Sequence, residues 1–265
     1  MHPILFHLGS FTFPTYGLMV ASGYLAAILY IFSKARPAGF KKEDLSDLVF
    51  YTVISGIAGA KFFYAATYWS EFGPDTLSRL VYVARSFQYG FVFYGGLIFG
   101  AAAFFYVGRR KRMDPLRTSD LFAPALSLGH AFGRIGCFMA GCCYGSPTTG
   151  PLSVIFTDPN SEVNPAFLGR PLYPVQLYES AGNFLIFLIL NYALKRSLAG
   201  KLPRGFSIAL YAALYSLLRF SDEFLRGDDR GAFHFGLSPA QLISAAVFVI
   251  AVTALAMMKL RHEKN

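Results

Sequence analysis

Long apolar blocks separated by short polar loops make up most of the chain. Within each block the apolar residues run together instead of recurring at helical or strand spacing. Each block has roughly the ~20 residues that a helix needs to cross a hydrocarbon layer of ~30 Å. We therefore expect an all-α membrane protein, with a single integral membrane domain over residues 1–265. Its seven predicted transmembrane helices lie at about residues 15–33, 46–68, 91–108, 120–142, 176–194, 205–225 and 238–258.

The composition excludes an ordinary soluble domain. The chain is 54% hydrophobic and only 15% charged, whereas soluble domains are about one quarter charged. Residues 1–15, which lead into the first block, contain no basic residue and no small-residue cleavage site. We therefore expect the first helix to remain in the mature protein.

The positions of lysine and arginine predict the orientation of the helices. Sixteen of the 24 Lys and Arg residues follow the first, third, fifth and seventh predicted helices, in residues 34–42, 109–117, 195–204 and 259–264. Because short cytoplasmic loops retain such residues, we expect the N-terminus outside and the C-terminus in the cytoplasm. This distribution accounts for the net charge of +9. It argues against nucleic-acid binding, which needs basic residues gathered on one face.

Three basic residues lie inside predicted helices, namely Lys61, Arg134 and Arg219. An ionisable group in a membrane helix is costly, so it usually faces the protein interior and marks a functional site. In the predicted orientation all three lie toward the outer leaflet. Arg134, for example, sits roughly 20 Å along a helix that enters from the cytoplasm near Asp120. We therefore expect a site that opens to the outside.

Other polar groups are predicted at the same depth. The fourth and sixth predicted helices each carry them as a stripe on one helix face. These stripes are His130, Arg134 and Cys137, at i, i+4 and i+7, and Tyr215, Arg219 and Glu223, at i, i+4 and i+8. The first and third helices add Tyr16, Tyr94, Gly95 and Gly96. With Lys61 of the second helix, groups from five helices would meet in one site.

Each of these residues alone also has a purely structural interpretation. Tyr16 suits a membrane interface, and Lys61 can extend its side chain to the surface. Arg219 and Glu223 can form a structural ion pair. His130 can be a hydrogen-bonded interior histidine, and the cysteines can fill apolar space. The convergence of these residues at one depth favours a functional site.

Two arginines with no lysine beside them indicate oxyanion binding, because a planar guanidinium can bind such a group through two parallel hydrogen bonds. At the outer leaflet the abundant oxyanion is the phosphate of a phospholipid. The residues therefore predict a lipid-headgroup enzyme or a lipid-binding protein. We expect no cofactor and no metal site, because nucleotide-binding motifs are absent and the cysteine spacing CxxxxCC is unusual for zinc.

Motifs along most of the chain resemble those of the prolipoprotein diacylglyceryl transferases. They are YGLM, YGGLIFG, GRIGCFMAGCCYG, YPVQLYE and LYSLLRFSDEFLRGD. The resemblance implies seven helices in the bacterial cytoplasmic (inner) membrane, with an external N-terminus. It implies a transferase that moves a diacylglyceryl group from phosphatidylglycerol, or a related phospholipid, to the thiol of a prolipoprotein lipobox cysteine at the outer leaflet. Glycerol phosphate would be released.

The same resemblance implies roles for individual residues. Arg134 and Arg219 would bind the lipid phosphate and stabilise the charge that develops on it. Glu223 would orient Arg219, while Tyr215 and Tyr16 would hydrogen-bond headgroup or ester oxygens. The remaining matches are Gly136 and Gly145, for close backbone approach, and Tyr178 and Glu179, for structural support near the site.

The chain departs from the family pattern within the site. The family has a histidine where Tyr94 stands. Its signature in the fourth helix has asparagine, asparagine and glutamate where this chain has Cys137, Ala140 and Cys142. A tyrosine with a pKa near 10 is a poor base at neutral pH. Either Tyr94 or His130 replaces the family histidine, or the reaction is altered.

The cysteines support an alternative hypothesis. A cation one turn away, at Arg134, favours the thiolate of Cys137, and thiolates are nucleophilic. An oxidising compartment could also join Cys142 or Cys143 to Cys137. In this alternative the protein uses its own cysteines for covalent lipid transfer or thiol redox chemistry; otherwise Cys142 and Cys143 line the substrate pocket. A third class, a non-catalytic lipid-binding protein, would be favoured by lipid binding without turnover.

Overall fold

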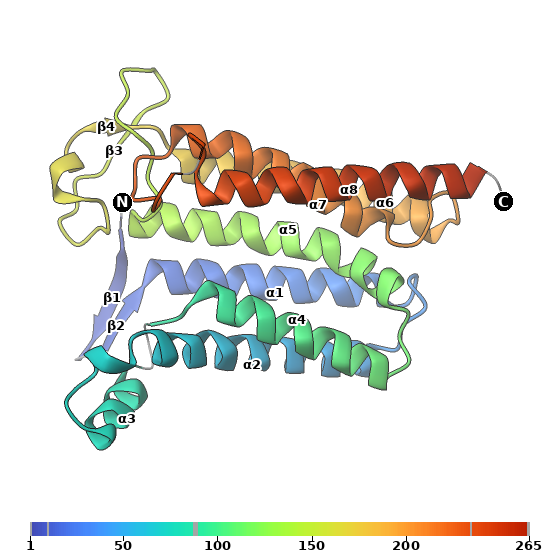
Figure 1. Ribbon diagram of the computed structural model, residues 1–265, viewed down its shortest axis with the longest axis horizontal. Coiled ribbons are helices and arrows are strands. Elements are labelled where there is room, and N and C mark those ends of the chain that lie inside the picture. The colour runs from blue at the N-terminus through green and yellow to red at the C-terminus, as the bar shows by residue number, and fades with distance from the viewer. Residues whose placement is uncertain (1, 10, 87–89, 234, 264–265) are drawn as a thin grey trace. The chain divides into compact units, whose positions relative to one another are not determined.

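The computed structural model describes residues 2–9, 11–86, 90–233 and 235–263, and this part of the chain is mostly helical (Figure 1). Its eight α-helices are α1 Thr15–Ala35, α2 Lys42–Thr67, α3 Thr76–Arg85, α4 Phe93–Arg110, α5 Pro115–Ala140, α6 Val175–Leu198, α7 Phe206–Asp222 and α8 Pro239–Glu263. The strands are β1 Ile4–Leu8, β2 Phe11–Pro14, β3 Val154–Ile155 and β4 Pro171–Leu172. Three short 3-10 helices are η1 Trp69–Glu71, η2 Pro165–Phe167 and η3 Glu223–Leu225.

Each of the seven predicted segments overlaps one α-helix, which confirms a mostly helical membrane protein. The four short strands depart from the predicted all-α class. Within the described residues, four helices are long and apolar enough to cross a membrane, namely α1, α2, α6 and α8. The other three are shorter or more polar: α7 has 17 residues, α4 ends in two arginines, and α5 contains Asp120 and Arg134.

The sequence patterns missed α3 and the antiparallel β1–β2 hairpin. Helix α3 has only 10 residues, and its sequence TLSRLVYVAR includes two arginines. The carboxylate of Asp75 starts this helix by accepting a hydrogen bond from the backbone N–H of Ser78 at 3.0 Å. Neither element contains an apolar block as long as those from which the other helices were predicted.

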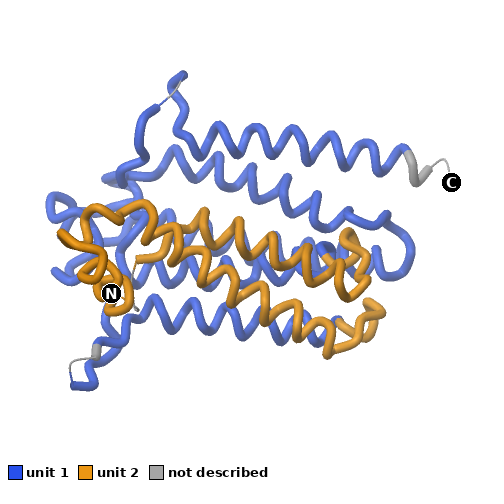
Figure 2. Tube along the Cα trace, turned by 60° about the horizontal axis from the view of Figure 1, so that its bottom comes forward, with its two compact units in different colours: residues 1–34, 119–265 blue, residues 35–118 orange. Residues whose placement is uncertain are grey.

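The chain divides into two compact units, one of residues 1–34 and 119–265 and the other of residues 35–118 (Figure 2). In the second unit α2 and α4 pack at glycines. A Cβ added to Gly59 would lie 2.6 Å from the carbonyl oxygen of Gly95, and one added to Gly96 would lie 3.2 Å from that of Gly56. Gly95 and Gly96 therefore allow these two helices to approach closely.

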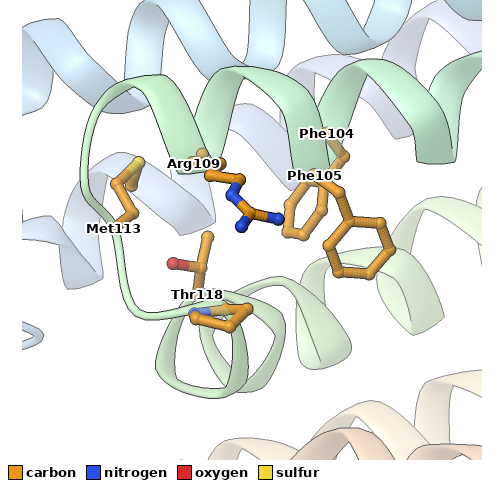
Figure 3. A pocket seen from close by; sticks show the side chains of 7 residues that line it. Phe104, Phe105, Arg109, Met113 and Thr118 are labelled. Atoms are coloured by element: carbon orange, nitrogen blue, oxygen red, sulfur yellow. The ribbon is translucent and has the colours of Figure 1, made fainter.

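The second unit also has a cavity of about 380 Å³ at the C-terminal end of α4 (Figure 3). Its lining residues are Phe104, Phe105, Gly108, Arg109, Met113, Pro115 and Thr118. The lining is mainly apolar apart from one guanidinium and one hydroxyl. None of the predicted site residues lies in this cavity.

In the first unit, buried polar groups join α5 to its neighbours. The Ser127 hydroxyl donates to the carbonyl of Asn183 at 2.7 Å, and the Ser180 hydroxyl donates to that of Ala131 at 2.8 Å, so α5 and α6 are linked twice. The carboxylate of Asp120 accepts hydrogen bonds from the backbone N–H groups of the first turn of α7, including Ile208 at 3.0 Å. These contacts fix the three helices that carry most of the candidate site.

The segment between α5 and α6 forms a small folded cap beyond the C-terminal end of α5 (Figure 1). It contains the β3–β4 pair and its own apolar cluster, made by Tyr144, Phe156, Val163 and Leu172. Gly145 forms a bridge with Arg226 after η3, and a Cβ added to Gly145 would lie 2.6 Å from Cβ of Tyr173. The cap therefore holds the chain after α5 against the end of α7.

Candidate active site

Arg134 lies on the α5 stripe that the sequence predicted, since α5 is one continuous helix from Pro115 to Ala140. Only 8% of Arg134 is exposed. Its Nη2 lies 2.8 Å from Oε2 of Glu179 on α6, a close ion pair although its geometry is not that of a hydrogen bond. Among the described residues, Nε of Arg134 has no hydrogen-bond partner. A buried guanidinium with an unused N–H donor can bind an oxyanion by donating a hydrogen bond to it.

Glu179 connects three of the predicted site residues. Besides the pair with Arg134, its Oε1 lies 3.6 Å from Nε2 of His130 and accepts a hydrogen bond from the Tyr215 hydroxyl at 3.4 Å. Glu179 is 1% exposed. The sequence interpretation assigned this residue to structural support, whereas the structure places it among the charged groups of the site. The available signal was a carboxylate inside an apolar helix, which is rare without a partner.

Arg219 and Glu223 form the predicted i, i+4 ion pair, with Nη1 and Oε2 2.5 Å apart. Glu223 is shared with other groups. Arg230 donates two hydrogen bonds to its carboxylate, at 2.7 and 2.6 Å, and the Ser238 hydroxyl donates a third at 2.6 Å. Glu223 therefore holds Arg219 and also ties the chain after η3 to the start of α8. Arg230 and Ser238 were not predicted, because loop residues give no periodic signal.

Arg134 and Arg219 belong to one charged region of the first unit. Both guanidiniums act electrostatically on His130 and on the carboxyl group of Asp222. Asp222, at the end of α7, is 6% exposed, and its Oδ2 has no hydrogen-bond partner among the described residues. The sequence analysis overlooked Asp222, which precedes Glu223 and lies off the predicted stripe.

Tyr16 and Gly136 lie together near the cysteines. A Cβ added to Gly136 would be 3.1 Å from Cδ2 of Tyr16, so this glycine allows α1 to pack against α5. Tyr16 is 43% exposed and interacts electrostatically with Cys137, Cys142 and Cys143. Within the described residues, the close approach predicted at Gly136 is therefore made by helix α1 to helix α5.

The three cysteines lie together where α5 ends. Their sulfur atoms are all within 4.8 Å of one another, and the cysteines are not joined by a disulfide. Nη1 of Arg134 lies 3.6 Å from Sγ of Cys137. Hydrogen bonds with the other two thiols, followed by the charges of Arg226 and Arg134, hold the pKa of the Cys143 thiol below its usual value.

Arg226 lies in the loop after η3 and was not among the predicted site residues. Its side chain is only 4% exposed and donates two hydrogen bonds to the carboxylate of Asp228, at 2.9 and 2.7 Å. It also interacts directly with the thiol of Cys143. The bridge between Gly145 and Arg226 brings this loop arginine inward.

Four of the predicted residues lie in the second unit and are described there. Tyr94, near the start of α4, is 58% exposed, and Gly95 and Gly96 pack against α2. Lys61 donates hydrogen bonds to the carbonyl and the hydroxyl of Ser86, at 2.6 and 2.8 Å. Their contribution to a substrate site remains a prediction.

Comparison with known proteins identifies the family. The chain matches the family described as "Prolipoprotein diacylglyceryl transferase" over residues 3–257. It is 35% identical to the phosphatidylglycerol--prolipoprotein diacylglyceryl transferase of Clostridium tetani, over 95% of this chain and 96% of that protein. For transferase 2 of Clostridium perfringens the identity is 36%, over 95% and 93%. For the Geobacter sulfurreducens transferase it is 32%, over 95% and 93%.

The order of the motifs, the buried arginine–glutamate pairs and the match over nearly the whole chain agree with one another. This chain belongs to the prolipoprotein diacylglyceryl transferase family.

Proposed function

We propose that this protein transfers a diacylglyceryl group from phosphatidylglycerol to a prolipoprotein. The name of each relative states this donor and this acceptor, and the similarity extends over the full length of the chain. The observation that carries the proposal at the level of the site is Arg134, a buried guanidinium whose Nε has no partner among the described residues. A second arginine, Arg219, acts electrostatically on the same histidine, His130, as Arg134 does. Such a pair suits the phosphate of a phospholipid.

The chemistry that these residues would support is a displacement at carbon. The acceptor thiolate attacks the glyceryl carbon that carries the phosphate ester. A C–S bond forms while the C–O bond breaks, and glycerol phosphate leaves with the electron pair. Arg134 and Arg219 stabilise the charge that develops on the departing phosphate. Glu179 and Glu223 hold these guanidiniums in place.

The incoming thiol must lose a proton. Within the first unit, His130 is the candidate base, because its Nε2 lies 3.6 Å from the Glu179 carboxylate, which can stabilise the imidazolium. Tyr94 is the other candidate, at the position where the family has histidine. Tyr16 and Tyr215 would hydrogen-bond the headgroup or the ester oxygens.

We propose seven transmembrane helices, α1, α2 and α4–α8, within one integral domain over residues 1–265. The N-terminus would be outside, the C-terminus in the cytoplasm, and the site at the outer leaflet of the bacterial cytoplasmic membrane. Four apolar helices of sufficient length, the distribution of Lys and Arg and bacterial relatives support this arrangement. The prolipoprotein would present its lipobox cysteine from the same side.

A second candidate function uses the protein's own thiols for covalent lipid transfer. The sulfur atoms of Cys137, Cys142 and Cys143 lie within 4.8 Å of one another, and Arg134 lies beside one of them. In that case the lipid would appear on the enzyme before it reaches any acceptor. A variant with all three cysteines replaced by serine would then be inactive, whereas the transferase that uses only the acceptor thiol would retain activity.

The purified protein in detergent, given labelled phosphatidylglycerol and a lipobox peptide, tests the proposal. Mass spectrometry should find the diacylglyceryl group on the peptide cysteine as a thioether. A peptide with serine in place of that cysteine is the matched control and should remain unmodified. Absence of a thioether product from correctly folded protein would contradict the proposed reaction.

A further inference from the structure

The three cysteines form a compact group of soft ligands at the end of α5. Cys137 is on the last turn of the helix, and Cys142 and Cys143 lie in the loop just after it. All three sulfur atoms lie within 4.8 Å of one another. A zinc ion bound at about 2.3 Å from each of three sulfurs would separate them by about 3.8 Å. The sulfurs therefore need to move by about 1 Å or less to share one ion.

The backbone after α5 holds this arrangement. Gly141 has φ +86°, and Cys143 has φ +58°, a left-handed conformation that residues with a Cβ rarely adopt. The Gln176 side chain donates to the carbonyl of Cys142 at 2.8 Å, and the N–H of Glu162 donates to that of Ala140 at 2.8 Å. An unfavourable conformation that the surrounding structure enforces is typical of functional sites.

The surrounding charges suit a metal bound by several thiolates. One Zn²⁺ with three thiolates carries a net charge of −1. The Arg134 guanidinium lies 3.6 Å from Sγ of Cys137, and Arg226 interacts with the thiol of Cys143, so two cations lie beside the thiols even though each also has a carboxylate partner. Binding from the reduced thiols releases up to three protons, one for each Zn–S bond formed.

A fourth ligand is within reach. The carboxylate of Glu162 hydrogen-bonds to the Cys142 thiol and acts electrostatically on Cys143. Glu162 is exposed, so its carboxylate is accessible to an ion from outside the protein. Zinc accepts carboxylate oxygen together with cysteine sulfur in tetrahedral sites.

We propose that Cys137, Cys142 and Cys143 form a binding site for Zn²⁺, with Glu162 as the fourth ligand. The sequence analysis expected no metal because the spacing of these cysteines is not a usual zinc motif. The close approach of the sulfurs depends on the turn at Gly141 and Cys143, which spacing alone does not reveal. The ligands of this site differ from the phosphate-binding arginines, although Arg134 lies beside Cys137.

The test uses the full-length protein in detergent, reduced and stripped of metal with a chelator. Titration with Co²⁺ should produce thiolate-to-cobalt charge-transfer absorption with a stoichiometry of one ion per chain, and Zn²⁺ should remove this absorption by displacement. Binding should release protons, up to three per ion, one for each thiol that is still protonated. If the reduced protein gives no charge-transfer absorption, the proposal is overturned.

Single variants identify the ligands. Cys137→Ser, Cys142→Ser and Cys143→Ser should each weaken Zn²⁺ binding by more than about 100-fold, above the 10–100-fold typical of residues that only support a ligand. Glu162→Gln should weaken it by about tenfold and keep the absorption. His7→Ala, which removes an exposed imidazole from β1, is the matched control and should change nothing.

Two results would overturn the assignment even if the protein binds metal. One is Zn²⁺ binding that persists in the three serine variants and is lost in His7→Ala, which would place the ion at surface histidines. The other is a stable disulfide between two of the cysteines in protein treated with a mild reductant, with only one reactive thiol per chain and no metal binding. Thiol titration of the same samples detects that disulfide.

Discussion

The two arginines of the candidate site are held in different ways. Arg134 on α5 depends on one carboxylate from another helix, Glu179 of α6, and retains an unused donor. Arg219 is paired with Glu223 four residues further along, a carboxylate that also accepts hydrogen bonds from Arg230 and Ser238. Both guanidiniums keep buried nitrogens without a hydrogen-bond partner among the described residues, Nε and Nη2 on Arg134 and Nη1 on Arg219, so the first arrangement leaves more capacity for a ligand. The second distributes one carboxylate over a network. We infer that Arg134 makes the more direct contact with the phosphate.

The largest expected effect is the loss of Arg134. Arg134→Ala should lower kcat by about 10²–10³, the range for removal of one preorganised donor to a developing charge. Arg134→Lys should fail to restore activity, because an ammonium group lacks the planar fork. Thioether formation in a mass-spectrometric assay measures both. Near-native activity of either variant, with normal membrane insertion, would show that the phosphate binds elsewhere.

The two carboxylates should differ in their effect on folding. Glu179→Gln leaves the buried Arg134 charge without its counterion and should lower the free energy of unfolding by about 3 kcal/mol. Glu223→Gln should cost less, since the side chain of Arg219 is 16% exposed and that of Arg134 only 9%. Thermal unfolding in detergent compares the two variants. Equal destabilisation by the two substitutions would contradict the proposed difference between the single Arg134–Glu179 pair and the network around Glu223.

A variant of Arg230 tests whether this residue only positions Glu223 or also contacts the substrate. Arg230→Gln removes two hydrogen bonds to Glu223 and leaves the Arg219–Glu223 pair in place. We expect kcat to fall by only about tenfold, the lower end of effects of residues that support a functional group. Steady-state kinetics with phosphatidylglycerol measures this. A loss as large as that of Arg134→Ala would place Arg230 in contact with the substrate.

The smallest expected effect concerns the pH at which the Cys143 thiol, which lies near Arg226 and Arg134, reacts with an alkylating reagent. Because the pKa of Cys143 lies below its usual value, its thiolate persists as the pH falls below the ordinary cysteine pKa of about 8.5. Metal-free protein should therefore react with iodoacetamide below pH 8. The Arg226→Gln variant should shift this reaction to higher pH, and Cys143→Ser should abolish it. A wild-type profile centred on about pH 8.5 would contradict the assigned influence of the arginines.

The helices were predictable because apolar blocks of sufficient length leave few other structures in a membrane. The i, i+4 spacing also predicted the Arg219–Glu223 pair, since Glu223 directly follows the last residue of α7. The Arg134–Glu179 pair was not predicted, because it depends on how α5 packs against α6. Asp222 and Arg226 were missed for a similar reason: one lies off the stripe, and the other is buried only by the folded cap.

The cysteines also show that contacts between separate elements are not predictable from the sequence. Their spacing along the chain allowed a disulfide but did not indicate that all three sulfurs meet, which a turn with two left-handed residues brings about. A sequence pattern reports neighbours on one regular element. Contacts made by a turn or between helices require the structure.

The central claim is that lipid passes from phosphatidylglycerol to an acceptor thiol, with the leaving phosphate bound by Arg134. The most direct measurement follows both products in one reaction of the wild-type protein: the thioether on the lipobox peptide and the glycerol phosphate released. The account predicts equal amounts of the two, with no lipid on the protein's own cysteines, and a parallel loss of both in Arg134→Lys. Glycerol phosphate release without peptide thioether, or lipid found on Cys137, Cys142 or Cys143, would contradict it.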